Sequence, residues 1–73
     1  MRVFENASYF EIADICTGQF ITIGRSRMYK VIDYAKHWND NGMYDKIMVV
    51  TDSKNMYKVF KCADLVGKRV VVY

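Results

Sequence analysis

A row of three lysines is the first feature that could do chemistry. Lys54, Lys58 and Lys61 are spaced four and three residues apart, which on a helix places their side chains along one outward line. Such a row could neutralise the phosphates of a nucleic acid, and Tyr57 beside it could stack on an exposed base. An ordinary solvated helix face has the same spacing, so nucleic-acid binding is one of two interpretations of this row.

A second basic group precedes the stretch that we expect to form the first helix. Arg25 and Arg27 would stand at the start of that helix, where free backbone N–H groups also attract anions. Three carboxylates in the same part of the chain, Asp33, Asp40 and Asp45, offset this positive charge. The two arginines therefore extend the hypothesis of nucleic-acid or anion binding without deciding it.

Residues typical of catalysis or metal binding are few and scattered. His37 is the only histidine, and Cys16 and Cys62 are too far apart for a metal-binding spacing. Residues 51–53, Thr-Asp-Ser, follow a buried strand as phosphate-binding loops do, but no glycine-rich motif accompanies them. Helix capping accounts for that aspartate and serine. We therefore expect no enzymatic activity, no cofactor, no metal site and no small-molecule substrate.

Aromatic side chains are the best argument for a protein partner. Trp38 falls at the edge of an apolar helix face and is assigned to the core. Tyrosine and methionine exceed what a core of this size needs, and both suit interfaces because they bury much area at low entropic cost. The residues expected to reach the surface and bind a partner are Tyr29, Tyr34, Tyr44 and Tyr57.

Size and composition set the class of protein. The chain has 73 residues, 52% of them apolar, and a net charge of +3, which suits one domain over residues 1–73 with a small core. No secretory signal is expected, and no apolar run approaches the roughly 20 residues that cross a bilayer. We therefore expect a cytoplasmic protein with reduced cysteines and no membrane contact. The many residues with A/T-rich codons, together with the short length, suit an accessory protein of viral type.

Hydrophobic spacing indicates the elements of the first half. Residues 9–15 alternate like a half-buried strand, Thr17 and Gly18 supply a turn, and residues 19–23 form the return strand. Ser26 can then cap a helix over residues 28–38, in which apolar side chains recur at helical spacing. The polar run 39–42 ends this helix, with Gly42 free to adopt the left-handed conformation.

The second half of the chain repeats this plan. Residues 46–51 are predicted to form a buried central strand and residues 69–73 the closing strand. Between them, residues 54–66 fit a helix capped by Asp52 or Ser53 and ended by Gly67, although residues 56–62 also fit a strand. The sequence Met-Tyr-Lys-Val at residues 28–31 recurs at residues 56–59, and this resemblance favours the helix.

The predicted fold class is therefore α+β. It is a small two-layer sandwich of order β-β-α-β-α-β, with two helices on one face of a four-stranded sheet and some parallel pairing. If residues 56–62 form a strand instead, the order becomes β-β-α-β-β-β.

The predicted function is that of a small non-enzymatic binding protein. It would dock on a protein partner, or on a second copy of itself, and modulate or inhibit that partner through its exposed tyrosines. The alternative is a nucleic-acid-binding module that uses Lys54, Lys58, Lys61, Arg25 and Arg27.

Overall fold

The computed structural model describes residues 1–73 and is predominantly β-structure. Its elements are the strands β1 (Arg2–Phe4), β2 (Phe20–Ile23), β3 (Tyr29–Trp38), β4 (Tyr44–Thr51), β5 (Tyr57–Lys61) and β6 (Val70–Val72), the short helix α1 (Tyr9–Ala13) and the 3₁₀ turn η1 (Cys62–Leu65). The six strands form one sheet in which every neighbouring pair is antiparallel. The predicted sandwich of two helices on a four-stranded, partly parallel sheet is therefore wrong.

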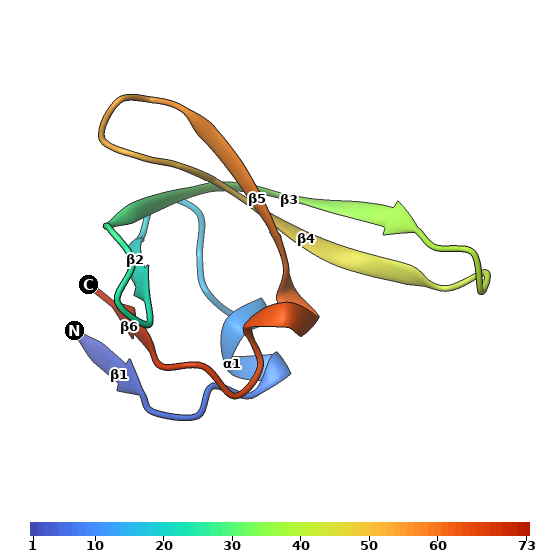
Figure 1. The fold of residues 1–73 in the computed structure, drawn as a ribbon, viewed down its shortest axis with the longest axis horizontal. Coiled ribbons are helices and arrows are strands. Elements are labelled where there is room, and N and C mark those ends of the chain that lie inside the picture. The colour runs from blue at the N-terminus through green and yellow to red at the C-terminus, as the bar shows by residue number, and fades with distance from the viewer.

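The sheet has the strand order β1-β6-β2-β3-β4-β5 and curls around the core (Figure 1). Strands β2 to β5 follow one another as a meander, and β6 returns to pair between β1 and β2. The helix α1 and the turn η1 contact each other across the open side of the curl, and η1 also packs against β4 and β5. Neither α1 nor η1 has the length and apolar character that a membrane-crossing helix needs.

The inner face of the curled sheet carries the core. Met48 and Val50 of β4 are fully buried, whereas Ile47 and Val49 alternate to the outer face and are half-buried. The other fully buried side chains include Ile12, Ile15, Ile21, Val31, Cys62, Val70 and Val72. Burial of each large apolar side chain contributes about 1.5–3 kcal/mol. The predicted strands over residues 19–23, 46–51 and 69–73 are confirmed as β2, part of β4 and β6.

The first predicted helix, over residues 28–38, is the strand β3. A bulge between Val31 and Asp33 inserts one residue into this strand. The inward-facing side chains therefore follow one another at steps of two and then three positions along the chain, at Tyr29, Val31 and Tyr34. This irregular spacing imitates the i, i+3 recurrence of a helix. The many β-branched and aromatic residues of the segment favour a strand, and that preference holds here.

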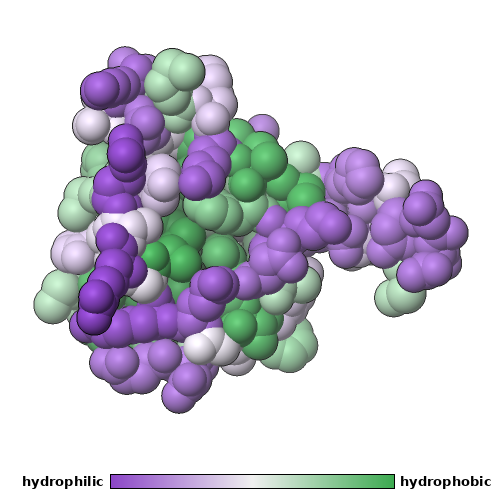
Figure 2. Space-filling view, viewed as in Figure 1, coloured by the Kyte–Doolittle hydropathy of each residue, from purple (hydrophilic) through white to green (hydrophobic).

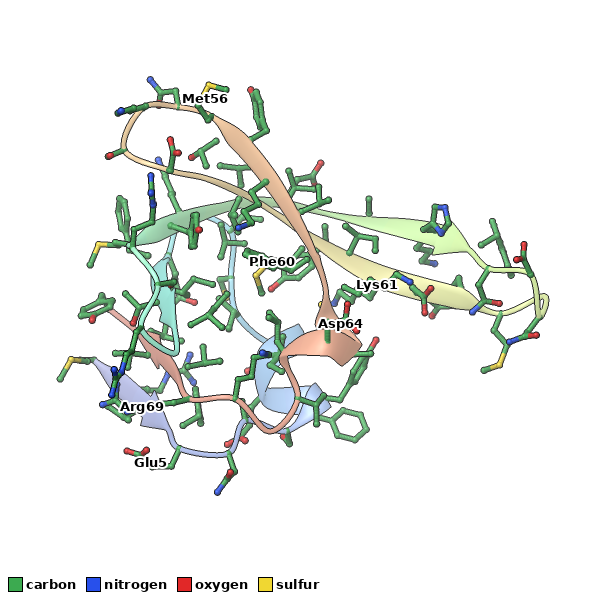
Figure 3. The ribbon with its side chains drawn as sticks, viewed as in Figure 1. Glu5, Met56, Phe60, Lys61, Asp64 and Arg69 are labelled. Carbon is green, nitrogen blue, oxygen red and sulfur yellow. The ribbon has the colours of Figure 1, made fainter.

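The second predicted helix is the strand β5 followed by the single turn η1. The alternative prediction of a strand over residues 56–62 is right for this segment. Val59 and Phe60 lie on opposite faces, with Phe60 turned toward the core (Figure 3). The Met-Tyr-Lys-Val repeat begins two strands, but Tyr29 is buried and Tyr57 is exposed, so the two copies are not equivalent units.

The first predicted strand, over residues 9–15, is the helix α1. Ser8 Oγ accepts the Glu11 N–H at 3.2 Å, and Glu11 Oε1 accepts the Ser8 N–H at 2.9 Å. This reciprocal pair is a capping box, a local signal that starts a helix. It outweighs the alternation of Phe10 and Ile12, of which only Ile12 is buried.

The polar run predicted to end a helix is the loop of the β3–β4 hairpin. Asn39 Oδ1 accepts the N–H groups of Asn41 and Met43, at 2.9 and 3.2 Å. The Asn39 N–H in turn donates to the Met43 carbonyl at 2.8 Å. Gly42 does take a left-handed conformation, with φ of +74°, but it does so within a hairpin.

The β4–β5 loop uses the same hydrogen-bond scheme. Asp52 Oδ1 accepts the N–H groups of Lys54 and Met56, at 2.8 and 3.0 Å, and the Asp52 N–H donates to the Met56 carbonyl at 3.1 Å. Asn55 occupies the left-handed position with φ of +60°, as Gly42 does in the other loop. Asp52 thus caps a hairpin loop, not a helix.

Candidate functional site

The distal part of the β3–β4 hairpin extends beyond the rest of the molecule as an arm, residues 36–46 (Figures 1 and 2). Strand pairing continues to the end of the arm, where Trp38 lies opposite Tyr44. The pairing of β4 with β5 stops at Ile47, so β3 is the only neighbour of β4 within the arm. The arm is therefore a two-stranded ribbon without a third strand beside it.

One face of the arm continues the inner face of the sheet, because side chains alternate along each strand. A groove lies between this face and Tyr9 of α1, with a volume of about 230 Å³ near the base and about 510 Å³ near the tip. We call it the arm groove. It is lined by Tyr9, Tyr34, Lys36, Trp38, Met43, Tyr44 and Lys46.

Hydrogen bonds to α1 hold the base of the arm groove in place. The Tyr34 hydroxyl donates to the carbonyl of Ile15 at 2.6 Å and lies 3.3 Å from that of Ile12. The Lys46 ammonium donates to the carbonyl of Ala13 at 3.2 Å. These contacts join β3 and β4 to the last turn of α1 and to the residues just after it. The helix and the arm are therefore fixed relative to each other at this point.

Burial keeps two ionisable groups near the groove in their neutral forms. Chiefly through burial, and further through the Cys62, Cys16 and Asp14 side chains, the pKa of Tyr34 is raised well above its usual value. Its phenol thus remains a hydrogen-bond donor. Burial also raises the pKa of Cys62, although Lys46 partly offsets this effect. A thiol with a raised pKa is a poor nucleophile at neutral pH.

Two exposed aromatic rings form the tip of the groove. The Trp38 and Tyr44 rings meet edge to face with centroids 5.8 Å apart. Trp38 is 68% exposed and Tyr44 is 49% exposed. The Lys36 ammonium lies 4.8 Å from the centre of the Tyr44 ring, and the Lys46 ammonium 4.5 Å from that of Tyr34. The groove therefore combines apolar rings with two cations that lie against them.

No carboxylate neutralises the lysines of the groove. The ion pairs of the structure join Arg27 to Asp52, Lys61 to Asp45 and Arg69 to Glu5. Lys36 and Lys46 take part in none of them. Both charges therefore remain available to a partner with acidic groups.

The four tyrosines predicted to bind a partner lie in different surroundings. Tyr29 is only 7% exposed and packs edge to face against Phe60, so it belongs to the core rather than to the surface. Tyr34 is half-buried at the base of the groove, and Tyr44 is at its tip. Tyr57 is 74% exposed on β5, away from the groove. The structure thus brings together two of the four.

The three lysines of the predicted helical row do not share one face. Lys54 lies in the β4–β5 loop. Lys58 faces inward over the Phe60 ring, at 5.3 Å from its centre, whereas Lys61 faces outward and approaches Asp45 at 3.8 Å. The expected basic helix face is therefore wrong, because the segment is a strand whose successive side chains alternate. All three lysines still lie along β5 and the loop before it.

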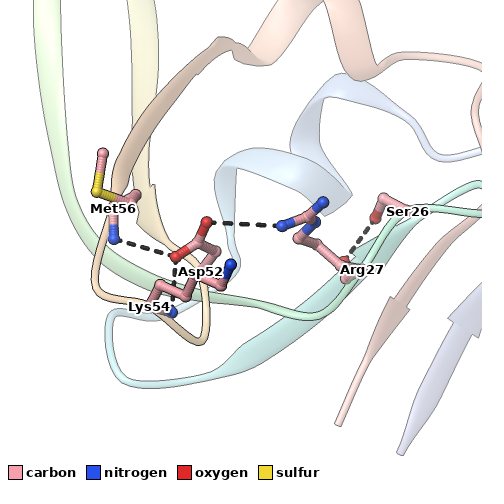
Figure 4. Close-up of polar contacts among 5 residues, drawn as sticks. All are labelled: Ser26, Arg27, Asp52, Lys54 and Met56. Atoms are coloured by element: carbon pink, nitrogen blue, oxygen red, sulfur yellow. Dashed lines mark hydrogen bonds and ion pairs between the residues drawn. The ribbon is translucent and has the colours of Figure 1, made fainter.

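The two predicted anion-binding arginines lie in the turn between β2 and β3, with no helix behind them. Arg27 approaches Asp52 at 3.8 Å, and Asp52 also caps the β4–β5 loop (Figure 4). Hydrogen bonds from the Met56 and Lys54 N–H groups lower the pKa of Asp52, with a smaller contribution from Arg27. Arg25 is exposed and forms no ion pair. The two arginines therefore do not form one anion site.

The remaining polar candidates are dispersed. His37 is exposed on the outer face of the arm, Cys16 is exposed and Cys62 is buried, and both cysteines are free thiols. No group of three or more His, Cys, Asp or Glu side chains is placed to share a metal ion.

Several residues of the arm groove were not predicted from the sequence. Tyr9, Lys36, Met43 and Lys46 are not among the predicted site residues, and Trp38 is predicted to be in the core. The signal that could have found Lys36, Trp38 and Lys46 is an alternation of aromatic and basic residues, Tyr-x-Lys-x-Trp at 34–38 and Tyr-x-Lys at 44–46. This pattern places all five side chains on one face only if both segments are strands.

Protein-family models, curated protein sequences and solved structures were each compared with the chain, and none of the three comparisons gave a match.

Proposed function

We propose that the chain is a non-enzymatic protein-binding module that docks on its partner through the arm groove and modulates that partner by covering part of its surface. The observation that carries this proposal is the exposure of Trp38 and Tyr44 at the end of a paired, well-formed ribbon. Both rings face the side on which the core lies, yet both stay exposed, with only Tyr9 of α1 across the groove from them. A partner would supply the missing cover.

The composition of the groove supports a protein partner. Tyrosine, tryptophan and methionine are enriched at the centres of protein interfaces, where a few large side chains contribute most of the binding energy. The hydrogen bonds from the Tyr34 hydroxyl to the carbonyls of Ile12 and Ile15 hold the base of the groove in one geometry before binding. Such preorganisation lowers the entropy lost on association.

The groove is less suited to a nucleic acid. Stacking of a base requires an open aromatic face, but the ammonium groups of Lys36 and Lys46 lie over the rings of Tyr44 and Tyr34. The edge-to-face contact of Trp38 and Tyr44 further restricts access to these rings. Two lysines also supply little of the phosphate neutralisation on which nucleic-acid affinity depends.

A capture experiment tests the proposal. The immobilised protein is exposed to a lysate of its source, and the captured proteins are compared with those captured by the double variant Trp38→Ala/Tyr44→Ala. Phe20→Ala is the matched control, because Phe20 is also an exposed ring but lies on β2, outside the arm groove. A specific partner should be lost with the double variant and kept with the control, with or without nuclease.

Two results would contradict the proposal. Retention of the partner by the folded double variant would show that the groove is not the docking surface. Loss of all capture after nuclease treatment would indicate a nucleic acid as the ligand, and retention on heparin that falls steeply with salt would support that alternative.

A further inference from the structure

We infer that the free edge of β5 binds an extended, acidic segment of a partner protein as a seventh strand of the sheet. This surface is separate from the arm groove. The inference rests on the proposed protein-binding function and adds the class of segment that is bound.

The backbone of β5 has one unused side. In an antiparallel ladder, hydrogen-bonded and non-hydrogen-bonded pairs alternate. The Asp52 N–H donates to the Met56 carbonyl, so these two residues form a hydrogen-bonded pair. Because every second residue of β5 has the same role, Lys58 and Phe60 also bond to β4. The N–H and C=O groups of Tyr57, Val59 and Lys61 therefore point away from β4, and β5 pairs with no other strand.

This edge is suited to an incoming strand. It is five residues long, has no proline and keeps a regular register with β4, whereas β1 at the other end of the sheet has three residues. Proteins usually protect such an edge with charged side chains, bulges, prolines or covering segments. On β5 the only such device is lysine, which opposes self-pairing but not pairing with an acidic strand. Here Val59 is 62% exposed beside a shallow groove of about 460 Å³, which is also lined by Ile47, Phe60 and Lys61.

The positive charge along the edge of β5 favours an acidic partner. Lys54, Lys58 and Lys61 lie along β5 and the loop before it, and of the three only Lys61 forms an ion pair, with Asp45 at 3.8 Å. Antiparallel pairing of two copies of β5 about Val59 would make the two copies of Lys58 diagonal neighbours on one face, with no opposite charge between them, which opposes self-pairing. An acidic segment would instead offset the lysine charges, so the edge fits an acidic partner better than a second copy.

The register predicts where the acidic residues belong. In an antiparallel seventh strand, residues opposite Lys61 and Lys58 are three positions apart, and the residue opposite Val59 lies between them. Acidic residues at the two outer positions would face both lysines, and a β-branched residue would cover Val59. The sequence Glu-Val-Val-Glu-Thr meets these requirements, with its first glutamate opposite Lys61.

The test uses this sequence as a capped, fluorescent peptide and measures its binding to the whole chain by fluorescence anisotropy. Val59→Pro is the central variant, because it removes an N–H that β4 does not use, and proline is tolerated on edge strands. Val59→Thr is the matched control that keeps the N–H. We expect binding to Val59→Pro to be weaker by about tenfold or more, and binding to Val59→Thr to be near that of the wild type.

Two further peptides separate strand pairing from simple charge attraction. Methylation of the backbone nitrogen of the central valine removes the N–H that would face β5, and it should weaken binding to the wild-type protein by about tenfold. Replacing both glutamates with lysine should abolish binding. The methylated peptide also tests the inference if Val59→Pro fails to fold, which thermal unfolding would reveal.

Equal binding of the methylated and unmethylated peptides would overturn the inference, as would equal binding of the acidic and basic peptides. Dimerisation of the chain through β5, detected by sedimentation and abolished by Val59→Pro, would identify a second copy as the occupant and also overturn it. Trp38→Ala/Tyr44→Ala should bind the peptide normally. If the peptide does not bind β5 but the Trp38→Ala/Tyr44→Ala variant still loses the partner from the lysate, the inference about β5 is wrong and the proposed function stands.

Discussion

The two halves of the β3–β4 hairpin have the same backbone pairing but opposite side-chain surroundings. In the body, the inner face of these strands carries Val31, Met48 and Val50, all of them fully buried. In the arm, the same face carries Trp38 and Tyr44, both of them exposed. Pairing between β3 and β4 runs through both regions. The difference shows that strand pairing builds the arm, whereas a core forms only where other elements face the sheet.

The boundary between the two regions lies where α1 ends its contact with the hairpin. Tyr34 and Lys46 bond to carbonyls of the last turn of α1 and the residues after it, and beyond this point only Tyr9 of α1 lies across from the arm. Side chains of the body should therefore matter for stability and those of the arm for binding.

Met48→Ala should cause the largest loss of stability. Met48 is fully buried in the body, and truncation of such a side chain leaves a cavity that costs about 2–5 kcal/mol. Urea unfolding followed by circular dichroism measures this cost. The matched arm variant Met43→Ala, which truncates an exposed methionine, should cost less than about 0.5 kcal/mol. Similar losses of unfolding free energy for the two variants would show that the body and the arm do not differ in their contribution to stability.

Tyr34→Phe should have an intermediate effect, because Tyr34 joins the two regions. The variant keeps the ring but removes the donor to the Ile12 and Ile15 carbonyls. The loss of these hydrogen bonds should lower the free energy of unfolding by about 1–2 kcal/mol. Tyr44→Phe is the control in the arm, and it should unfold at the urea concentration of the wild type. A neutral Tyr34→Phe would show that α1 is held without this contact.

The two hairpin loops should differ in their response to acid. Asp52 has a pKa lowered below its ordinary value of 3.8 in the folded protein. Its contribution to stability is therefore complete above that value and is lost as the pH falls through the lower, folded pKa. Protonation should increase hydrogen exchange at the Lys54 and Met56 amides. The Asn41 and Met43 amides bond to Asn39, whose side chain is uncharged, so protonation of a capping side chain should not change their exchange rates. Hydrogen exchange followed by NMR at low pH measures both loops.

Asp52→Asn sharpens this prediction. The side-chain amide oxygen of the introduced asparagine would still accept both N–H groups but would not titrate in this range, so the acid-dependent exchange of the Lys54 and Met56 amides should disappear. Acid-dependent exchange that persists in the variant would place its cause in another carboxylate.

Trp38→Ala should have the smallest effect on folding. Its ring is exposed in the arm and contacts mainly Tyr44, so the change in unfolding free energy should be below about 0.5 kcal/mol. Capture of the partner should nevertheless fall sharply. A destabilisation comparable to that of Met48→Ala would mean that the arm belongs to the folding unit and would remove the physical basis of the proposed groove.

Part of the architecture is readable from local patterns. The apolar runs at residues 47–50 and 70–72 predict strands, and the Asn-Asp-Asn-Gly run at residues 39–42 predicts the end of an element, although that element is expected to be a helix. The Ser8–Glu11 capping box is an equally local signal for α1, although alternation over residues 9–15 points to a strand. Helical periodicity over residues 28–38 misleads because one bulge shifts the phase of the alternation.

The residue types available for binding, chiefly tyrosines and lysines, and the positions of three strands follow from the amino-acid sequence. Which of these side chains lie together depends on the packing of the folded chain. A strand presents two faces, and the elements packed against each face settle which one is buried. Tyr29 and Trp38 belong to the same strand, yet Tyr29 is buried and Trp38 is exposed, because the elements that enclose the core pack against Tyr29, whereas only Tyr9 of α1 lies near Trp38.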